Sequence, residues 1–201
     1  MNKKSLRSSG LPVLGLLVGF ILLSGCSPVG LVFGAGAATG IAAYEERDMA
    51  VIAKDLEMSA LLRARLFDKD PELAAKIGIE VYEGRILLTG VLDTESQRGV
   101  ALAQAWKTGG VKDVYNEILL GSDGGVLNFI YDSLITTELK SKITLDEKIL
   151  AINYVIVTVN GTIYLLGIAQ DRKELDRVMA YARNLDYVRR IVDHVLIKGA
   201  S

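Results

Sequence analysis

The sequence predicts an α+β protein built from two tandem copies of one αββαβ unit, and three observations lead to this prediction. Shifted by 77 residues, the chain matches itself without a gap, so that 55–120 falls on 132–197. Four glycines stay aligned in this match, Gly84 with Gly161 and Gly90 with Gly167. The apolar spacing ahead of these glycines is kept as well. A match that preserves turn glycines and apolar spacing together indicates a duplicated structural unit.

Each copy is expected to begin with a helix, because apolar residues recur at every fourth position ahead of the glycines. They are Met58, Leu62 and Leu66 in the first copy, and Ile135, Leu139 and Ile143 in the second. A hairpin of two short strands should follow, over 77–82 and 85–90 and again over 153–159 and 162–167. Glu83-Gly84 and Asn160-Gly161 are expected at its turns, since the central residues of such turns need positive φ.

A second helix and a last strand complete each copy. The helix is expected over 94–107 and 172–184, and the strand over 114–120 and 191–197. If the last two strands share a sheet, the helix between them forms a right-handed crossover. Each sheet then has three strands packed on two helices. A unit of about 65 residues buries only about 60% of its unfolded surface, so the two copies are expected to support each other.

The first 25 residues predict a secretory signal of the lipoprotein type. Three basic residues precede an apolar run over 11–23, which is too short to span a bilayer comfortably. Leu23-Ser24-Gly25-Cys26 then has the form of a lipobox, in which the cysteine is lipidated and carries acyl chains such as palmitate. Cys26 is the only cysteine, so an internal disulfide is excluded. The alternative is an uncleaved N-terminal anchor with an incidental cysteine.

The sequence thus divides into a signal (1–25), an anchor with a Gly/Ala-rich tether (26–47), two repeats (48–120 and 132–198) and a linker (121–131). The tether is expected to be flexible, with packing on the bilayer as the alternative. The linker is expected to hinge at its glycines and then to pack through its apolar residues. Because Ser27 rather than Asp follows the cysteine, sorting rules favour the outer membrane, with the protein facing the periplasm.

The repeat resembles the BON domain, a small αββαβ module of bacterial envelope proteins. The aligned glycines carry this resemblance, as do the paired positions Val111…Val114 and Val188…Ile191 ahead of the last strands. The segments VYNEI (114–118) and ITTELKSKI (135–143) are similar to the corresponding segments of dual-BON outer-membrane lipoproteins of the DolP type. The resemblance implies that the first helix of the second copy faces phospholipid. Leu134 stands in that helix where the resemblance implies an aromatic residue.

Residue types that support catalysis are scarce. His194 is the single histidine and is expected on the last strand, where a structural or solvated role is far more common than a catalytic one. With no second histidine and only the anchor cysteine, Cys/His catalysis and histidine-rich metal sites are excluded. The four aligned glycines fit hairpin turns and strand ends rather than a phosphate-binding loop. We therefore expect no enzyme, no metal and no cofactor beyond the covalent lipid on Cys26.

The distribution of charge favours a membrane partner. Without the signal the chain has 20 basic and 24 acidic residues, which argues against nucleic-acid binding. The first copy has a net charge of -3 and the second of +1. Lys140 and Lys142 lie on the first helix of the second copy, where each contributes roughly 1 kcal/mol near an anionic membrane. Leu134 should add apolar insertion. The alternative is that these lysines only solvate an exposed face.

The sequence therefore predicts a non-enzymatic, lipid-anchored protein whose second repeat binds anionic phospholipid and which supports envelope integrity. Its expected lipid contacts are Leu134, Lys140 and Lys142. The alternative is a protein-interaction module that recruits outer-membrane assembly or cell-wall partners. In that case a partner strand would add to a sheet edge formed by 114–120 or 191–197.

Overall fold

The computed structural model describes residues 45–121 and 125–199, apart from the side chain of Val126. The predicted signal, the lipidation site Cys26 and nearly all of the predicted tether lie outside the described residues. Residues 122–124 of the predicted linker lie outside them too. Among the described residues, no helix combines the length and the apolar character that a bilayer crossing requires.

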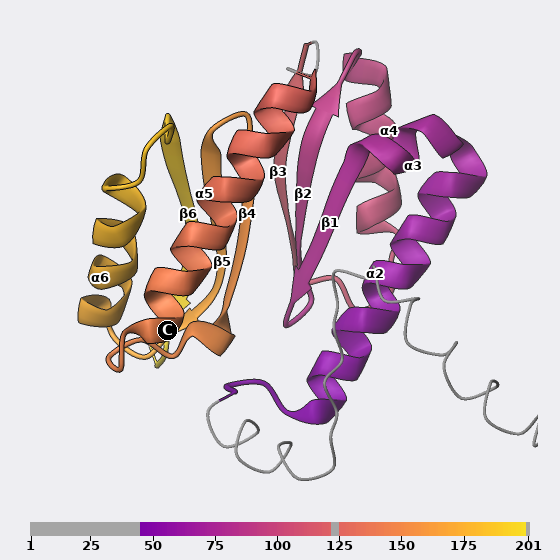
Figure 1. The fold of residues 1–201 in the computed structure, drawn as a ribbon. Coiled ribbons are helices and arrows are strands. Elements are labelled where there is room, and N and C mark those ends of the chain that lie inside the picture. Colours follow the sequence, from indigo (N-terminus) through magenta and orange to yellow (C-terminus); the bar gives the residue numbers. More distant parts are fainter. Residues whose placement is uncertain (1–44, 122–124, 200–201) are drawn as a thin grey trace, which may run out of the picture. The chain divides into compact units, whose positions relative to one another are not determined.

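The first repeat has the predicted order of elements with one short helix added (Figure 1). Its elements are α2 (Met49–Lys69), α3 (Pro71–Lys76), β1 (Ile77–Tyr82), β2 (Arg85–Leu92), α4 (Glu95–Trp106) and β3 (Asp113–Leu120). The sheet has the order β1-β2-β3. β1 runs antiparallel to β2, whereas β3 runs parallel to it. The helix between two parallel neighbours is therefore a crossover, as predicted.

The second repeat copies this topology. Its elements are α5 (Gly125–Leu145), a 3-10 turn η2 (Ala151–Asn153), β4 (Tyr154–Val159), β5 (Thr162–Ala169), α6 (Arg172–Arg183) and β6 (Arg190–Ile197). Its sheet has the order β4-β5-β6 with the same strand directions. The predicted fold class, two tandem αββαβ units of α+β type, is confirmed. α3 and η2 are not among the elements that the sequence predicts.

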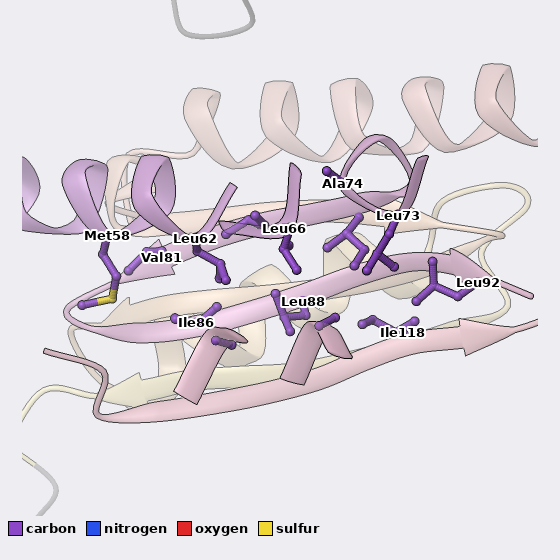
Figure 2. Close-up of a cluster of buried hydrophobic side chains, with 14 residues drawn as sticks. Met58, Leu62, Leu66, Leu73, Ala74, Val81, Ile86, Leu88, Leu92 and Ile118 are labelled. Carbon is purple, nitrogen blue, oxygen red and sulfur yellow. The ribbon is translucent and has the colours of Figure 1, made fainter. Parts of the chain in front are cut away.

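The helices of each repeat cover one face of its sheet. In the first repeat, Met58, Leu62 and Leu66 of α2 point at the strand residues Ile86 and Leu88 (Figure 2). Leu62, Leu66, Ile86 and Leu88 are fully buried, and Met58 is 6% exposed. The second repeat has the same arrangement, with Ile135, Leu139 and Ile143 in its core. The four-residue spacing thus marks the buried stripe of each first helix.

The helix starts are specified by local capping. Asp70 caps α3 by accepting hydrogen bonds from the backbone N–H groups of Glu72 and Leu73, and Pro71 occupies the first turn. Thr94 and Gln97 form a reciprocal capping box at the start of α4. These contacts satisfy N–H groups that have no partner inside the helix.

The two repeats contact each other through the sheet faces that their helices leave uncovered. A small apolar cluster joins them, made of Tyr82, Leu87, Tyr164 and Leu166. The guanidinium of Arg85 donates to the carbonyl oxygens of Gly167 at 2.9 Å and His194 at 3.0 Å. Glu117 and His194 occupy equivalent positions and contact each other at 2.9 Å. Equivalent residues meet where two copies are related by an approximate two-fold axis.

The chain enters the folded part between the repeats. Glu46 is held by the second repeat, because its carboxylate accepts from Gln170 at 2.7 Å and from Lys198 at 3.0 Å. Arg47 is held by the first repeat, because it pairs with Asp55 at 3.1 Å and lies 4.0 Å above the ring of Tyr82. Two consecutive side chains therefore fasten this segment to both repeats.

The end of the predicted linker differs from expectation. α5 begins at Gly125, so that the apolar residues after the glycines form the first turns of a helix. Leu127 is 66% exposed and Phe129 is 72% exposed, so they do not pack against the core as expected. For Leu127 the reason is the helical period, which places it about 120° away from the middle of the buried stripe of α5.

Candidate functional site

The exposed side of α5 carries a line of apolar side chains. Leu127, Ile130, Tyr131 and Leu134 follow the i, i+3, i+4, i+7 spacing that places residues on one helix face. We call these four residues the apolar stripe. Their exposed fractions are 66%, 45%, 39% and 57%. The stripe occupies the first half of α5, whereas the core residues Ile135, Leu139 and Ile143 lie on another side of the helix, from its middle to its end.

The two predicted lysine contacts do not lie together. Lys142 is exposed, and its ammonium pairs with Glu138 one turn away at 3.4 Å. Lys140 lies two residues earlier and hence on a different side of the helix. Burial raises the pKa of the Glu80 carboxyl on β1, and the nearby charge of Lys140 partly offsets this rise. Lys140 therefore lies close to the first repeat, whereas Leu134 belongs to the apolar stripe.

An aspartate on the first helix of each repeat holds the hairpin turn. Both oxygens of Asp55 accept backbone N–H groups, from Glu83 at 2.8 Å and Gly84 at 2.9 Å. Asp132 does the same for Asn160 and Gly161, at 2.7 Å each. Hydrogen bonds to an ionised acceptor are about twice as strong as neutral ones. This turn-holding role was not predicted from the sequence, although the two aspartates are aligned and each lies three residues before the first core residue of its helix.

The aligned glycines lie where a side chain has no room. Gly90 and Gly167 have φ of 123° and 147°, and an added Cβ would come within 2.2 Å of the Lys76 carbonyl oxygen and 2.0 Å of that of Asn153. The turn glycines Gly84 and Gly161 have φ of 77° and 74°. All four therefore allow backbone segments to approach closely.

A cavity lies beside the hairpin turn in each repeat, at equivalent positions. The first measures about 450 Å³ and is lined by charged groups that include Lys54, Glu57, Glu83 and Lys112. The second measures about 320 Å³. It is lined by Asn128, Tyr131, Asp132, Asn160, Gly161, Tyr187, Val188 and Arg189. Tyr131 belongs both to this lining and to the apolar stripe, so the cavity opens next to the stripe.

Tyr187 has an unusual backbone at the edge of the second cavity. Its φ is 66°, in the left-handed region, whereas the equivalent residue of the first repeat is Gly110 with φ of 86°. A left-handed backbone costs a residue other than glycine about 1 kcal/mol or more. The ring of Tyr187 is 63% exposed and lies 4.5 Å from that of Tyr131. No signal in the sequence marks this residue, because its backbone conformation is visible only in the structure.

The single histidine lies where the sequence placed it, on the last strand. His194 stacks on Tyr115 at 4.1 Å between ring centroids and hydrogen-bonds to Glu117. Both of these partners come from β3 of the other repeat. Within the described ranges, no group of three or more potential metal-ligating side chains is close enough to hold a metal ion.

Comparison with known families gives two matches to one family model. The model of the BON domain matches residues 55–122 and 131–199. These ranges follow the two structural repeats, and together they cover more than half of the chain.

Three relatives have similar sequences. An uncharacterised protein in the gshII 5' region of Anaplasma centrale is 37% identical over 63% of this chain and 85% of its own length. The 21 kDa hemolysin of Actinobacillus pleuropneumoniae is 33% identical over 62% of this chain and 64% of its own length, which is short of two thirds. The outer membrane lipoprotein DolP of Haemophilus influenzae is 30% identical over 79% of this chain and 82% of its own length.

Proposed function

Because the chain belongs to the BON-domain family and carries two copies of the domain, we propose that it is a non-enzymatic lipoprotein of the bacterial envelope. In this proposal the protein is anchored through Cys26 in the outer membrane and faces the periplasm. Two features support this location. The N-terminus reads as a lipoprotein signal with Ser27 after the cysteine, and the relative with the longest alignment of the three is named an outer membrane lipoprotein.

The second repeat, in our proposal, binds anionic phospholipid through α5 and thereby supports envelope integrity. The observation that carries this proposal is the exposed apolar stripe of α5. Full burial of one leucine side chain contributes about 1.5–3 kcal/mol, so insertion of Leu127 and Leu134 alone gives a substantial membrane affinity. Lys142, exposed about two turns beyond Leu134 on the same helix, adds attraction to anionic headgroups.

Within this proposal, the three predicted contacts differ in how much each contributes to membrane binding. Leu134 becomes the central contact, because it lies in the stripe and is 57% exposed. Lys142 contributes an exposed positive charge about two turns away on the same helix. Lys140 acts at longer range, since the charge of Glu80 lies close to it. The apolar stripe rather than the lysine pair therefore supplies most of the binding.

Sedimentation with lipid vesicles tests this function. The chain from residue 26 onward, with Cys26→Ser to remove the anchor, should bind phosphatidylglycerol-containing vesicles better than pure phosphatidylcholine vesicles. Leu134→Glu should weaken this binding at least about tenfold, because it replaces an exposed apolar side chain of the stripe with a charge. Leu56→Glu is the control, since it makes the same change at a leucine of similar exposure, 62%, on the first helix of the first repeat. Equal binding to both kinds of vesicle would rule the proposal out.

Recruitment of a protein partner is the second candidate. β3 and β6 each pair with a single neighbour, so that each has one edge without a strand partner within the described sheets. Photo-crosslinking from exposed positions such as Asn116 on β3 would detect outer-membrane assembly or cell-wall partners. A dominant protein adduct that persists in Leu134→Glu would favour this function over lipid binding.

A further inference from the structure

The geometry points to the cavity beside Tyr187 as the site that receives the headgroup phosphodiester of a membrane glycerophospholipid. This inference rests on the proposed function and adds to it: the stripe supplies insertion, and the cavity supplies recognition. At about 320 Å³ the cavity is at the lower end of the range for small-molecule sites. Its size therefore suits a small polar group rather than an acyl chain.

The position of the cavity relative to the stripe is the first argument. Tyr131 contributes to both, and Asn128 follows Leu127 directly on α5. A lipid whose acyl chains meet the stripe would therefore have its headgroup beside the cavity. Tyr131 and Tyr187, with rings 4.5 Å apart, stand between the two regions. Tyrosine is enriched at the interface between the acyl chains of a membrane and the surrounding water, because its ring is apolar and its hydroxyl is polar.

The polar groups of the lining form the second argument. Arg189 is exposed, and no carboxylate of the described residues lies within ion-pair distance of its guanidinium. A guanidinium binds phosphate oxygens through two parallel hydrogen bonds. The side-chain amide of Asn128 donates to that of Asn160 at 2.8 Å, which fixes a pair of amides next to the arginine. Asp132 is the one carboxylate of the lining, and both of its oxygens already accept turn N–H groups.

The equivalent cavity of the first repeat provides the contrast. Its lining holds Asp55, Glu57 and Glu83 against Lys54 and Lys112, so that it is unfavourable for an anion. In the second repeat Leu134 replaces Glu57 and Asn160 replaces Glu83. These two changes remove carboxylates from the equivalent region. The phosphodiester site is therefore specific to the second repeat.

Tyr187 supplies the third argument. The first repeat makes the same turn with Gly110, so the fold itself does not need a side chain at this position. The second repeat keeps an exposed tyrosine there despite its left-handed backbone. Strained residues of this kind cluster at functional sites. A role in holding the headgroup explains why the tyrosine is retained.

Vesicle binding of matched variants tests the inference. Arg189→Gln and Tyr187→Gly should each weaken binding to phosphatidylglycerol vesicles about tenfold, the usual effect of losing a hydrogen bond to a charged group. Lys112→Gln, the equivalent change in the first repeat, should leave binding unchanged. Thermal unfolding provides the second readout. Tyr187→Gly should leave Tm unchanged or raise it, because glycine relieves the strained backbone, so that lost binding cannot be attributed to unfolding.

The outcomes separate this inference from the proposed function. If both cavity variants bind like the unsubstituted protein while Leu134→Glu does not bind, the headgroup site is wrong and the membrane function stands. If the unsubstituted protein shows no preference for anionic vesicles, both fail. Soluble glycerophosphoglycerol distinguishes the ligand source by NMR. If this probe shifts the cavity amides while the cavity variants still bind vesicles normally, the site takes a soluble phosphodiester and the inference is overturned.

Discussion

The two repeats share one fold and differ at the surface beside their hairpin turns. Both keep the buried stripe of the first helix, the aspartate that holds the turn, and glycines at the same two points. Around the turn, however, the first repeat has charged side chains where the second has Tyr131, Leu134 and Asn160. The shared positions therefore maintain the fold, whereas the differing positions give the second repeat an apolar face of its own.

The largest effect is expected at the strand glycines that both repeats share. Gly167→Ala should destabilise the chain by roughly 3 kcal/mol or more, because the added Cβ would lie 2.0 Å from a backbone oxygen. Gly90→Ala should have a similar effect, since its clash distance is 2.2 Å. Urea denaturation measures both.

Gly99→Ala is the control for these glycine variants. It lies in α4 with no atom within 4 Å of an added Cβ, and alanine there should stabilise the helix by up to about 1 kcal/mol. The same curves test whether the repeats fold together. If the sheet contacts couple the repeats, each glycine variant shifts one common transition. If Gly90→Ala or Gly167→Ala unfolded at the same urea concentration as the parent, the close approach of the backbone at these two glycines would be contradicted.

The turn-holding aspartates should come next and should distinguish the repeats. Asp132→Ala should cost about 2 kcal/mol, because it removes two charge-assisted hydrogen bonds from the turn. Asp55→Ala should cost more, since Asp55 also pairs with Arg47 at 3.1 Å. Thermal and urea unfolding give both values. Equal costs would show that the Arg47 contact adds nothing to the first repeat.

Arg85 tests the contact between the repeats. Arg85→Met should cost about 1.5 kcal/mol, because its guanidinium donates to carbonyl oxygens of β5 and β6 while its aliphatic part is replaced by one of similar size. Lys112→Met on the surface of the first repeat is the control and should stay within about 0.5 kcal/mol of the parent. If the two substitutions have equal effects on urea unfolding, Arg85 does not couple the repeats.

The smallest effect is expected for Glu46 and depends on pH. Hydrogen bonds from Lys198 and Gln170 lower the pKa of Glu46 in the folded chain. Its contribution is therefore complete above the unfolded pKa of about 4.3, and it is lost as the pH falls through the folded pKa. Because the pair is near the surface, we expect about 0.5 kcal/mol.

Stability measured from about pH 6 down to about pH 3 checks this expectation. Glu46→Gln should fall less in stability over that range than the parent does. If the stability of the two proteins fell equally over this pH range, the contact of Glu46 with the second repeat would not favour the ionised carboxylate over the protonated form.

Most of the fold could be predicted from local patterns. Alternating apolar residues around Asn160-Gly161 predicted a hairpin, and its strands end within a few residues of the expected positions. α3 was missed although Asp70-Pro71 is a helix-start signal, because the helix has only six residues and no apolar period of its own. The apolar residues after the linker glycines were assigned to packing, since exposure depends on which side of α5 faces the sheet.

The candidate site was predictable only in part. Leu134 could be found from helical spacing, because a residue out of phase with the core stripe faces outward. The separation of Lys140 from Lys142 follows from their two-residue spacing on a helix, but the closeness of Lys140 to Glu80 depends on how the first repeat approaches α5. Tyr187 depends on a backbone angle that a non-glycine residue rarely adopts. Long-range placement and backbone geometry thus account for the missed parts.

The neighbouring contacts of Glu46 and Arg47 have a mechanical consequence. A pull on the chain ahead of Glu45 would reach the first repeat through the backbone that continues into α2, and the second repeat through the side chain of Glu46. The hydrogen bonds of Glu46 with Gln170 and Lys198 would have to break before this segment could move away from the second repeat. If the N-terminus is the membrane anchor that we propose, tension on it would therefore act on both repeats rather than on the first alone.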